Sequence, residues 1–125
     1  MNKAGPDIVA GLLAALIVAG AASAGANAAL GAHPWWALQT GLIGAVIGVV
    51  VFSGAGWFRV PIWVRGLLGL TTLALAGSAA YFGKATFVAS FGDNPLAGRF
   101  WFLGWFGVSA GAVIVLATAF AWVRR

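Results

Sequence analysis

Residues 104–123, GWFGVSAGAVIVLATAFAWV, form a stretch of twenty residues without a charge. Because an α-helix rises about 1.5 Å per residue, a helix of this length crosses the roughly 30 Å hydrocarbon core of a bilayer. Trp101, Trp105 and Trp122 lie near its two ends, and indole rings favour the boundary between lipid and water. The stretch therefore predicts a transmembrane helix, and the rest of the chain must be compatible with a lipid environment.

The composition agrees with a membrane protein. The chain is 62% hydrophobic and 7% charged, whereas a soluble domain has about 25% charged residues. The formal net charge of +5 would point to nucleic acid in a soluble protein, but here the basic residues lie between and beyond apolar segments, as membrane topology requires. We therefore expect no nucleic-acid partner, and the sequence identifies no soluble substrate. The chain has no cysteine, which excludes disulfides and cysteine-ligated metals.

Three further apolar segments precede the last one. We predict an all-α integral membrane protein of one domain, residues 1–125, with four transmembrane helices in an antiparallel bundle. The expected spans are about 8–30, 36–52, 64–82 and 100–123. The first has an alternative interpretation as a secretory signal peptide, with Lys3 ahead of the apolar residues and an A-x-A site at 26–28. Asp7 directly precedes the apolar residues, which favours an uncleaved span.

The distribution of lysine and arginine predicts the orientation. With four spans, the face that holds both termini has more basic residues than the opposite face. The first face holds Lys3, Arg59, Arg65, Arg124 and Arg125, and the second holds Lys84 and Arg99. Since cytoplasmic segments are richer in lysine and arginine, both termini are predicted to be cytoplasmic, in a bacterial inner membrane. Asp7 and Asp93 then lie on opposite faces.

Glycine-rich segments predict close helix packing. Gly44 and Gly48 form a G-x-x-x-G pattern in the second span, and Gly107 and Gly111 have the same spacing in the fourth. Small residues let helix backbones approach one another in lipid. Asn27 is the most polar side chain in any span, and we expect it to form a hydrogen bond between helices, with a ligand or ion contact as the alternative. Both contacts within the chain and contacts with neighbouring subunits fit these patterns.

Aromatic and basic residues are expected at the membrane surface. In segment 53–65 aromatic residues alternate with arginines, so the rings would dip inward while the guanidinium groups reach lipid phosphates. Segment 83–99 is predicted to be the longest connection, with a helical turn lying flat on the membrane, and to be a docking surface for another protein. The predicted interface residues are Trp57, Arg59, Trp63, Arg65, Trp101, Trp105 and Trp122.

The chain lacks the groups that catalysis requires. Acid–base catalysis needs positioned titratable groups, and the two carboxylate side chains, Asp7 and Asp93, are predicted on opposite faces. A single histidine excludes a multi-histidine metal site. No nucleotide-binding or nucleophile motif occurs. We expect no Asp, Glu, Lys or Arg in the interior of the bilayer, where ion-coupled transporters place one. The sequence therefore predicts neither an enzyme nor a metal site.

His33 is the one candidate for a cofactor site. A neutral imidazole could ligate a porphyrin or chlorin metal, or donate a hydrogen bond to a quinone carbonyl. Trp35, Trp36 and Gln39 follow closely in the sequence and could line such a headgroup site. The candidate ligands at the periphery are lipid, carotenoid, chlorin and quinone. The alternative is a histidine in an interfacial loop that contacts water and phosphates.

Two functions are compatible with this sequence. We favour a small non-catalytic accessory subunit of a larger membrane protein complex, such as a photosynthetic or respiratory energy-converting assembly. It would pack against other membrane subunits through its glycine-rich helices and bind lipid, quinone or pigment tails. The alternative is a homo-oligomeric channel or carrier for small or apolar solutes. Its few polar contacts would be Asn27, Gln39, Thr71 and Ser78.

Overall fold

All of the regular secondary structure in the part of the chain that the structure describes is helical. The computed structural model describes residues 4–124, and side chains from residue 7 onward; Lys3 and Arg125, which enter the charge distribution above, lie outside the described residues. The helices are α1 (Ala4–Ser23), α2 (Ala26–Leu30), α3 (Ala37–Trp57), α4 (Ile62–Ala89) and α5 (Pro95–Val123). Within this described part, α3, α4 and α5 are long and apolar enough to cross a membrane, and Asp7–Ser23 is a shorter apolar helix.

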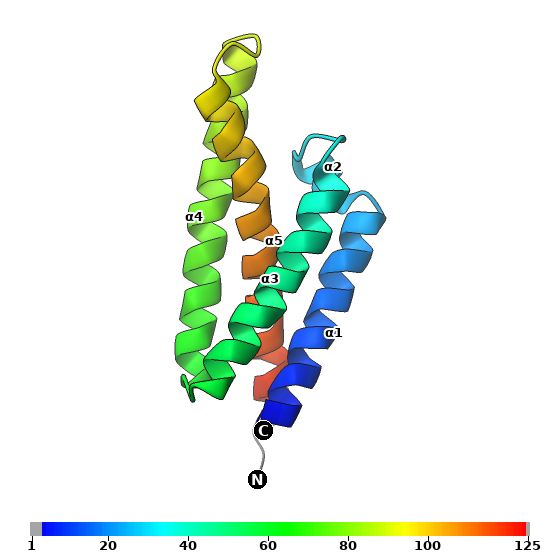
Figure 1. Ribbon diagram of the computed structural model, residues 1–125, viewed down its shortest axis with the longest axis vertical. Helices are drawn as coiled ribbons and strands as arrows, with labels where there is room; N and C mark the ends of the chain where they lie inside the picture. The colour runs from blue at the N-terminus through cyan, green and yellow to red at the C-terminus, as the bar shows by residue number, and fades with distance from the viewer. Residues whose placement is uncertain (1–3, 125) are drawn as a thin grey trace.

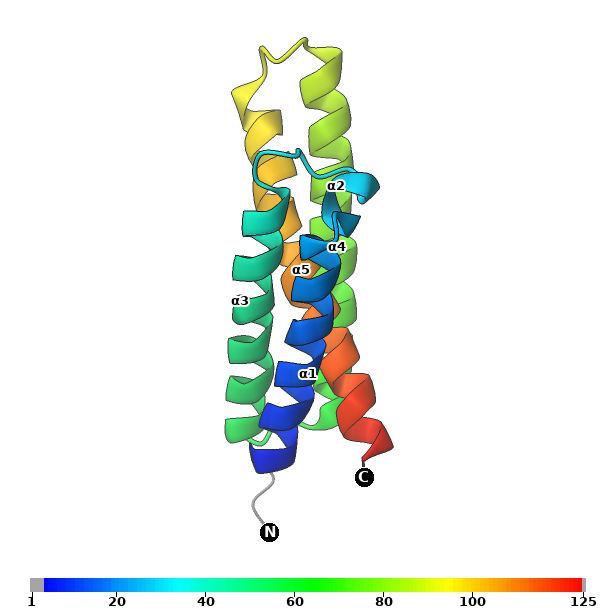
Figure 2. The same cartoon turned by 90° about the vertical axis from the view of Figure 1, so that its right-hand side faces the viewer.

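Helix α5 is the centre of the arrangement. It packs against α4 along most of its length and against α3 and α1 on other sides, while α1 also packs on α3 (Figures 1 and 2). Among the described residues, no part of the α4 backbone comes close to α1 or α2. Helix α1 begins and α5 ends at the same end of the molecule, and the α4–α5 hairpin extends past α2 and α3 at the other end. Helix α4 is therefore held mainly by α5.

Glycine permits these close contacts. A Cβ placed on Gly48 would lie 2.7 Å from Val113 Cβ and 2.8 Å from the Ala110 carbonyl oxygen on α5. A Cβ on Gly111 would lie 2.9 Å from the backbone nitrogen of Leu73 on α4. Any side chain at these positions would push the helices apart. The other two glycines of the predicted patterns lie in the same pair of interfaces, Gly44 against α5 and Gly107 against α4.

The buried core consists mostly of alanine. One cluster joins the lower parts of α1, α3 and α5 around Phe52 and Val113, and the other lies around Trp101 and Trp105. Alanine side chains bury little apolar area, so they contribute less to stability through the hydrophobic effect than leucine would. They keep the helix axes close together, and the larger apolar side chains, such as Leu16, Leu42 and Leu75, lie on the exterior. This inside-out distribution suits a protein surrounded by lipid.

The observed helices differ from the predicted spans at four places. Helix α3 continues to Trp57, past the predicted end near residue 52. The first apolar segment is interrupted between α1 and α2, where Gly25 adopts a φ of 90° that favours glycine. Helix α4 continues to Ala89, so the separate helical turn predicted within 83–99 is not formed. The connection between α4 and α5 is only 90–94, because the Asn94 side chain accepts a hydrogen bond from the Ala97 backbone N–H at 3.0 Å and caps α5 there.

Candidate functional site

His33 lies in the connection between α2 and α3. Its Nδ1 accepts a hydrogen bond from the backbone N–H of Trp35 at 3.1 Å. Since one nitrogen of a neutral imidazole accepts and the other carries the proton, this bond places the proton on Nε2. A nitrogen that carries a proton donates hydrogen bonds and does not ligate a metal. Of the two predicted roles of His33, the geometry therefore favours the hydrogen-bond donor.

Rings from two distant parts of the chain surround His33. Its ring stacks on Trp36 with centroids 5.9 Å apart and meets Trp101 of α5 edge-on at 5.6 Å. Trp35 touches the same ring from outside and is 90% exposed. Gln39, the fourth member of the predicted set, is exposed on the first turn of α3 and does not enter this ring cluster. The structure thus brings together His33, Trp35 and Trp36 but not Gln39.

Trp101 is the residue of this cluster that sequence reasoning assigned elsewhere. It was predicted, with Trp105, among the residues of the membrane interface, and both side chains are only 7% exposed. Its indole Nε1–H donates a hydrogen bond to the Gly31 carbonyl oxygen at 2.9 Å, which ties α5 to the end of α2. The amine of Lys84 lies 5.8 Å from the centroid of the Trp101 ring, within reach of a cation–π contact. Trp36 and Trp101 also meet edge-on, with ring centroids 5.3 Å apart. The predicted topology puts both residues at the same membrane boundary, and this is the sequence signal for their contact.

A groove opens beside this cluster. It has a volume of about 550 Å³ and lies between the end of α2, one face of α4 and the adjoining face of α5. The gap exists because α4 packs on α5 and leaves α1 and α2 at a distance. Its walls are largely apolar, and Lys84 is the one charged residue among the described residues that line it. The groove is a candidate ligand site next to the predicted one.

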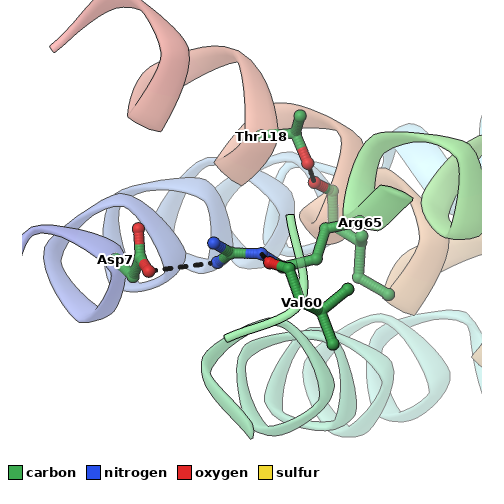
Figure 3. Close-up of polar contacts among 5 residues, drawn as sticks. Asp7, Val60, Arg65 and Thr118 are labelled. Atoms are coloured by element: carbon green, nitrogen blue, oxygen red, sulfur yellow. Dashed lines mark hydrogen bonds and ion pairs between the residues drawn. The ribbon is translucent and has the colours of Figure 1, made fainter. Parts of the chain in front are cut away.

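A second polar site lies at the opposite end of the molecule, where Asp7 of α1 and Arg65 of α4 form a buried ion pair (Figure 3). Arg65 Nη1 and Asp7 Oδ2 are 3.2 Å apart, and each side chain is 4% exposed. Arg65 Nε–H also donates a hydrogen bond to the Val60 carbonyl oxygen at 3.1 Å. The guanidinium carbon lies 4.7 Å from the centroid of the Phe52 ring. The Arg65 guanidinium group therefore contacts α1, α3 and the turn before α4.

The buried position of Arg65 corrects the sequence-based interpretation. Arg65 was expected at the membrane surface with its guanidinium group on lipid phosphates, but its side chain is enclosed by the protein. Gly56 makes this possible, since a Cβ there would lie 2.8 Å from Asp7 Oδ2 and 3.0 Å from Arg65 Nη1. The predicted topology is the signal that could have revealed the pair. It puts Asp7 and Arg65 on the same side of the membrane, each near the first turn of a helix. The remaining predicted interface residues are exposed: Trp57, Arg59, Trp63 and Trp122.

Two of the polar residues proposed for a solute path, Asn27 and Ser78, lie on different helices and in different surroundings. Asn27 is buried, with its Nδ2 at 3.4 Å from Ser109 Oγ and 3.5 Å from the Ala37 carbonyl oxygen, both long hydrogen bonds between helices. The Ser78 hydroxyl donates to the Ala74 carbonyl oxygen of its own helix at 2.8 Å, on the exposed side of α4. Residues 4–124 contain no group of three or more His, Cys, Asp or Glu side chains that could hold a metal ion.

Comparisons with protein family models, with curated proteins and with solved structures found no match to this chain.

Proposed function

We propose that this chain is a small accessory subunit without a catalytic role, and that it packs against other subunits of a membrane protein complex. In this proposal α1 and α2 together form the first span, and α3, α4 and α5 form the other three. Both termini face the cytoplasm of a bacterium. The proposal follows the positive-inside rule together with the position of the two chain ends at one end of the molecule.

The observation that carries this proposal is the uncovered surface of α4. Only 11% of its 18-residue apolar segment is buried, against 39% in α3 and in α5. Its free side presents Thr71, Ala74 and Ser78 at helical spacing among larger apolar residues. Small and hydroxyl-bearing residues at such spacing are typical of helix–helix interfaces in membranes. A transmembrane helix of a neighbouring subunit would pack on this face.

The ring cluster at His33 supports an energy-converting assembly as the parent complex. Because Nδ1 of His33 accepts a hydrogen bond, its Nε2–H is the group that can donate one. A quinone carbonyl at the membrane boundary could accept this hydrogen bond. A quinone or pigment held there would lie at the surface of the subunit, between it and its neighbours.

A photo-crosslinking residue introduced at Ser78 tests the proposed interface. We expect the Ser78 variant, irradiated in native membranes, to form one discrete product with a different protein, because this face of α4 would contact a fixed neighbour. The matched control is Val46, which is also exposed on a membrane-length helix but lies on α3, and it should give no such product. Blue-native electrophoresis of the same membranes should show the chain in a large species.

Two results would contradict the accessory role. Migration only as a free small species, with no crosslink from Ser78, would show that no neighbour is present. A Ser78 product of twice the mass of the chain would instead favour the homo-oligomeric channel or carrier.

A further inference from the structure

The groove between α2, α4 and α5 has an apolar body and one cationic end. Gly77 and Ala80 line its α4 side and Trp105 its α5 side. A Cβ added to Gly77 would meet no atom within 4 Å, so the space beside it is open. A volume of about 550 Å³ lies within the range of roughly 300–1,000 Å³ that small-molecule sites occupy. The body of the groove therefore suits an apolar chain.

Lys84 is placed to receive an anion. Its amine lies 5.8 Å from the centroid of the Trp101 ring and faces Gly31 at the end of α2. The side chain is exposed, and none of the described carboxylates forms an ion pair with it. Its charge is thus available to a ligand in the groove.

The position of Lys84 along α4 matches a membrane boundary. Ile62 and Lys84 are 22 positions apart on one helix, which corresponds to about 33 Å of helix length. The hydrocarbon core is about 30 Å thick, so when the Trp63 end of α4 lies at one boundary, Lys84 lies at the other. Gly77 is about 10 Å deeper in the bilayer by the same rise. The amine is then at headgroup level and the groove at the level of the acyl chains.

We propose that this groove is a binding site for a phospholipid with an anionic headgroup. The headgroup phosphate, whose charge is not offset by a cationic group such as choline, pairs with the Lys84 amine, and one acyl chain lies along Gly77 and Ala80 against Trp105. A neutral quinone would fill the apolar body and could accept a hydrogen bond from the amine, but a phosphate also pairs its own negative charge with the ammonium, which is why the lipid is the better occupant. The site would suit an accessory subunit, but it does not depend on that role, because the groove is formed by this chain alone.

Native mass spectrometry of the purified chain, titrated with phosphatidylglycerol or with phosphatidylcholine, tests this site. The wild-type chain should retain phosphatidylglycerol in preference. Lys84→Gln should weaken retention of phosphatidylglycerol about five-fold and remove the preference, since a lysine near an anionic surface contributes about 1 kcal/mol. Gly77→Leu should lower retention of both lipids, because its side chain fills the groove where there is open space. Arg99→Gln is the matched control, an exposed cation outside the groove, and should behave as wild type.

Each arm can overturn the proposal. Unchanged retention in Lys84→Gln would show that the amine does not bind the headgroup. An equal loss in Arg99→Gln would show that any exposed cation on this face suffices. Unchanged retention in Gly77→Leu would place the bound lipid elsewhere on the surface. Elution of each variant at the wild-type position in size exclusion verifies the fold, and the crosslinking result at Ser78 has no bearing on these outcomes.

Discussion

Asp7→Leu is expected to destabilise the protein by about 3–5 kcal/mol, because the substitution leaves Arg65 as an uncompensated buried charge. Arg65 is enclosed by α1, α3 and the turn before α4 and is only 3% exposed. The Val60 carbonyl oxygen and the Phe52 ring remain after the substitution, but neither carries a formal negative charge. Reversible unfolding in mixed detergent micelles, followed by tryptophan fluorescence, measures the loss.

The double variant Asp7→Leu with Arg65→Met is the critical comparison. Replacing both members of a buried ion pair by apolar residues is often neutral or stabilising, so this variant should recover most of the stability that Asp7→Leu loses. Arg59→Gln, which removes an exposed arginine six residues away, should change stability little. If Asp7→Leu alone is as stable as wild type, the pair makes no contribution to the fold.

This ion pair has a consequence for the position of α1. The backbones of α1 and α4 stay apart in the described part of the chain, and the Asp7–Arg65 contact bridges them at the end that holds both termini (Figures 1 and 3). Helix α1 is otherwise held by small-residue contacts with α3 and α5, such as Ala10 and Ala14. We expect α1 to be the helix most loosened when the pair is removed.

Gly48→Ala is expected to cost about 1–3 kcal/mol, although alanine is the better helix former. The added methyl group would lie 2.7 Å from Val113 Cβ and 2.8 Å from the Ala110 carbonyl oxygen. Backbone atoms cannot rotate away as a flexible side chain can, so α3 and α5 must separate. Thermal unfolding in detergent should show a clear drop in the midpoint temperature.

Gly54→Ala provides the matched control on the same helix. A Cβ at Gly54 meets no atom within 4 Å, so this variant should be as stable as wild type or more stable, by up to about 1 kcal/mol. Equal stability of the two variants would mean that the α3–α5 interface adapts freely, and that the predicted G-x-x-x-G pattern does not determine how closely the helices pack.

The sequence predicts the helical class well and the polar contacts poorly. Long uncharged stretches indicate membrane-length helices directly, as at α3, α4 and α5. The break after Ser23 is harder to predict, because glycine is so frequent in this chain that Gly25 does not stand out. In the part of α4 that extends beyond the predicted span, Gly83 lies against α5, where a Cβ would be 2.6 Å from the Trp101 backbone nitrogen. Contacts of this kind have no local sequence signal.

The candidate sites show the same limit. His33 and its neighbouring tryptophans can be picked out because they are adjacent in the chain, whereas Trp101 reaches them from α5. Arg65 resembles an ordinary surface arginine between aromatic residues, and only its partner 58 positions earlier explains its burial. The groove at Lys84 exists because the α4 backbone stays away from α1 and α2. The hydrophobic pattern of a single helix does not predict such a gap between helices.

The central claim, a four-span membrane protein with both termini cytoplasmic, can be tested by labelling single cysteines. The chain has no cysteine of its own, so Asn2→Cys, Trp35→Cys, Phe58→Cys and Phe91→Cys each present one thiol. The last three side chains are 90%, 80% and 96% exposed, so the reagent can reach them wherever the membrane permits. A membrane-impermeant thiol reagent applied to intact cells should label the Trp35 and Phe91 variants. The Asn2 and Phe58 variants should react only after the membrane is permeabilised. Labelling of Phe58→Cys in intact cells, or equal labelling of Asn2→Cys and Trp35→Cys, would contradict the claim.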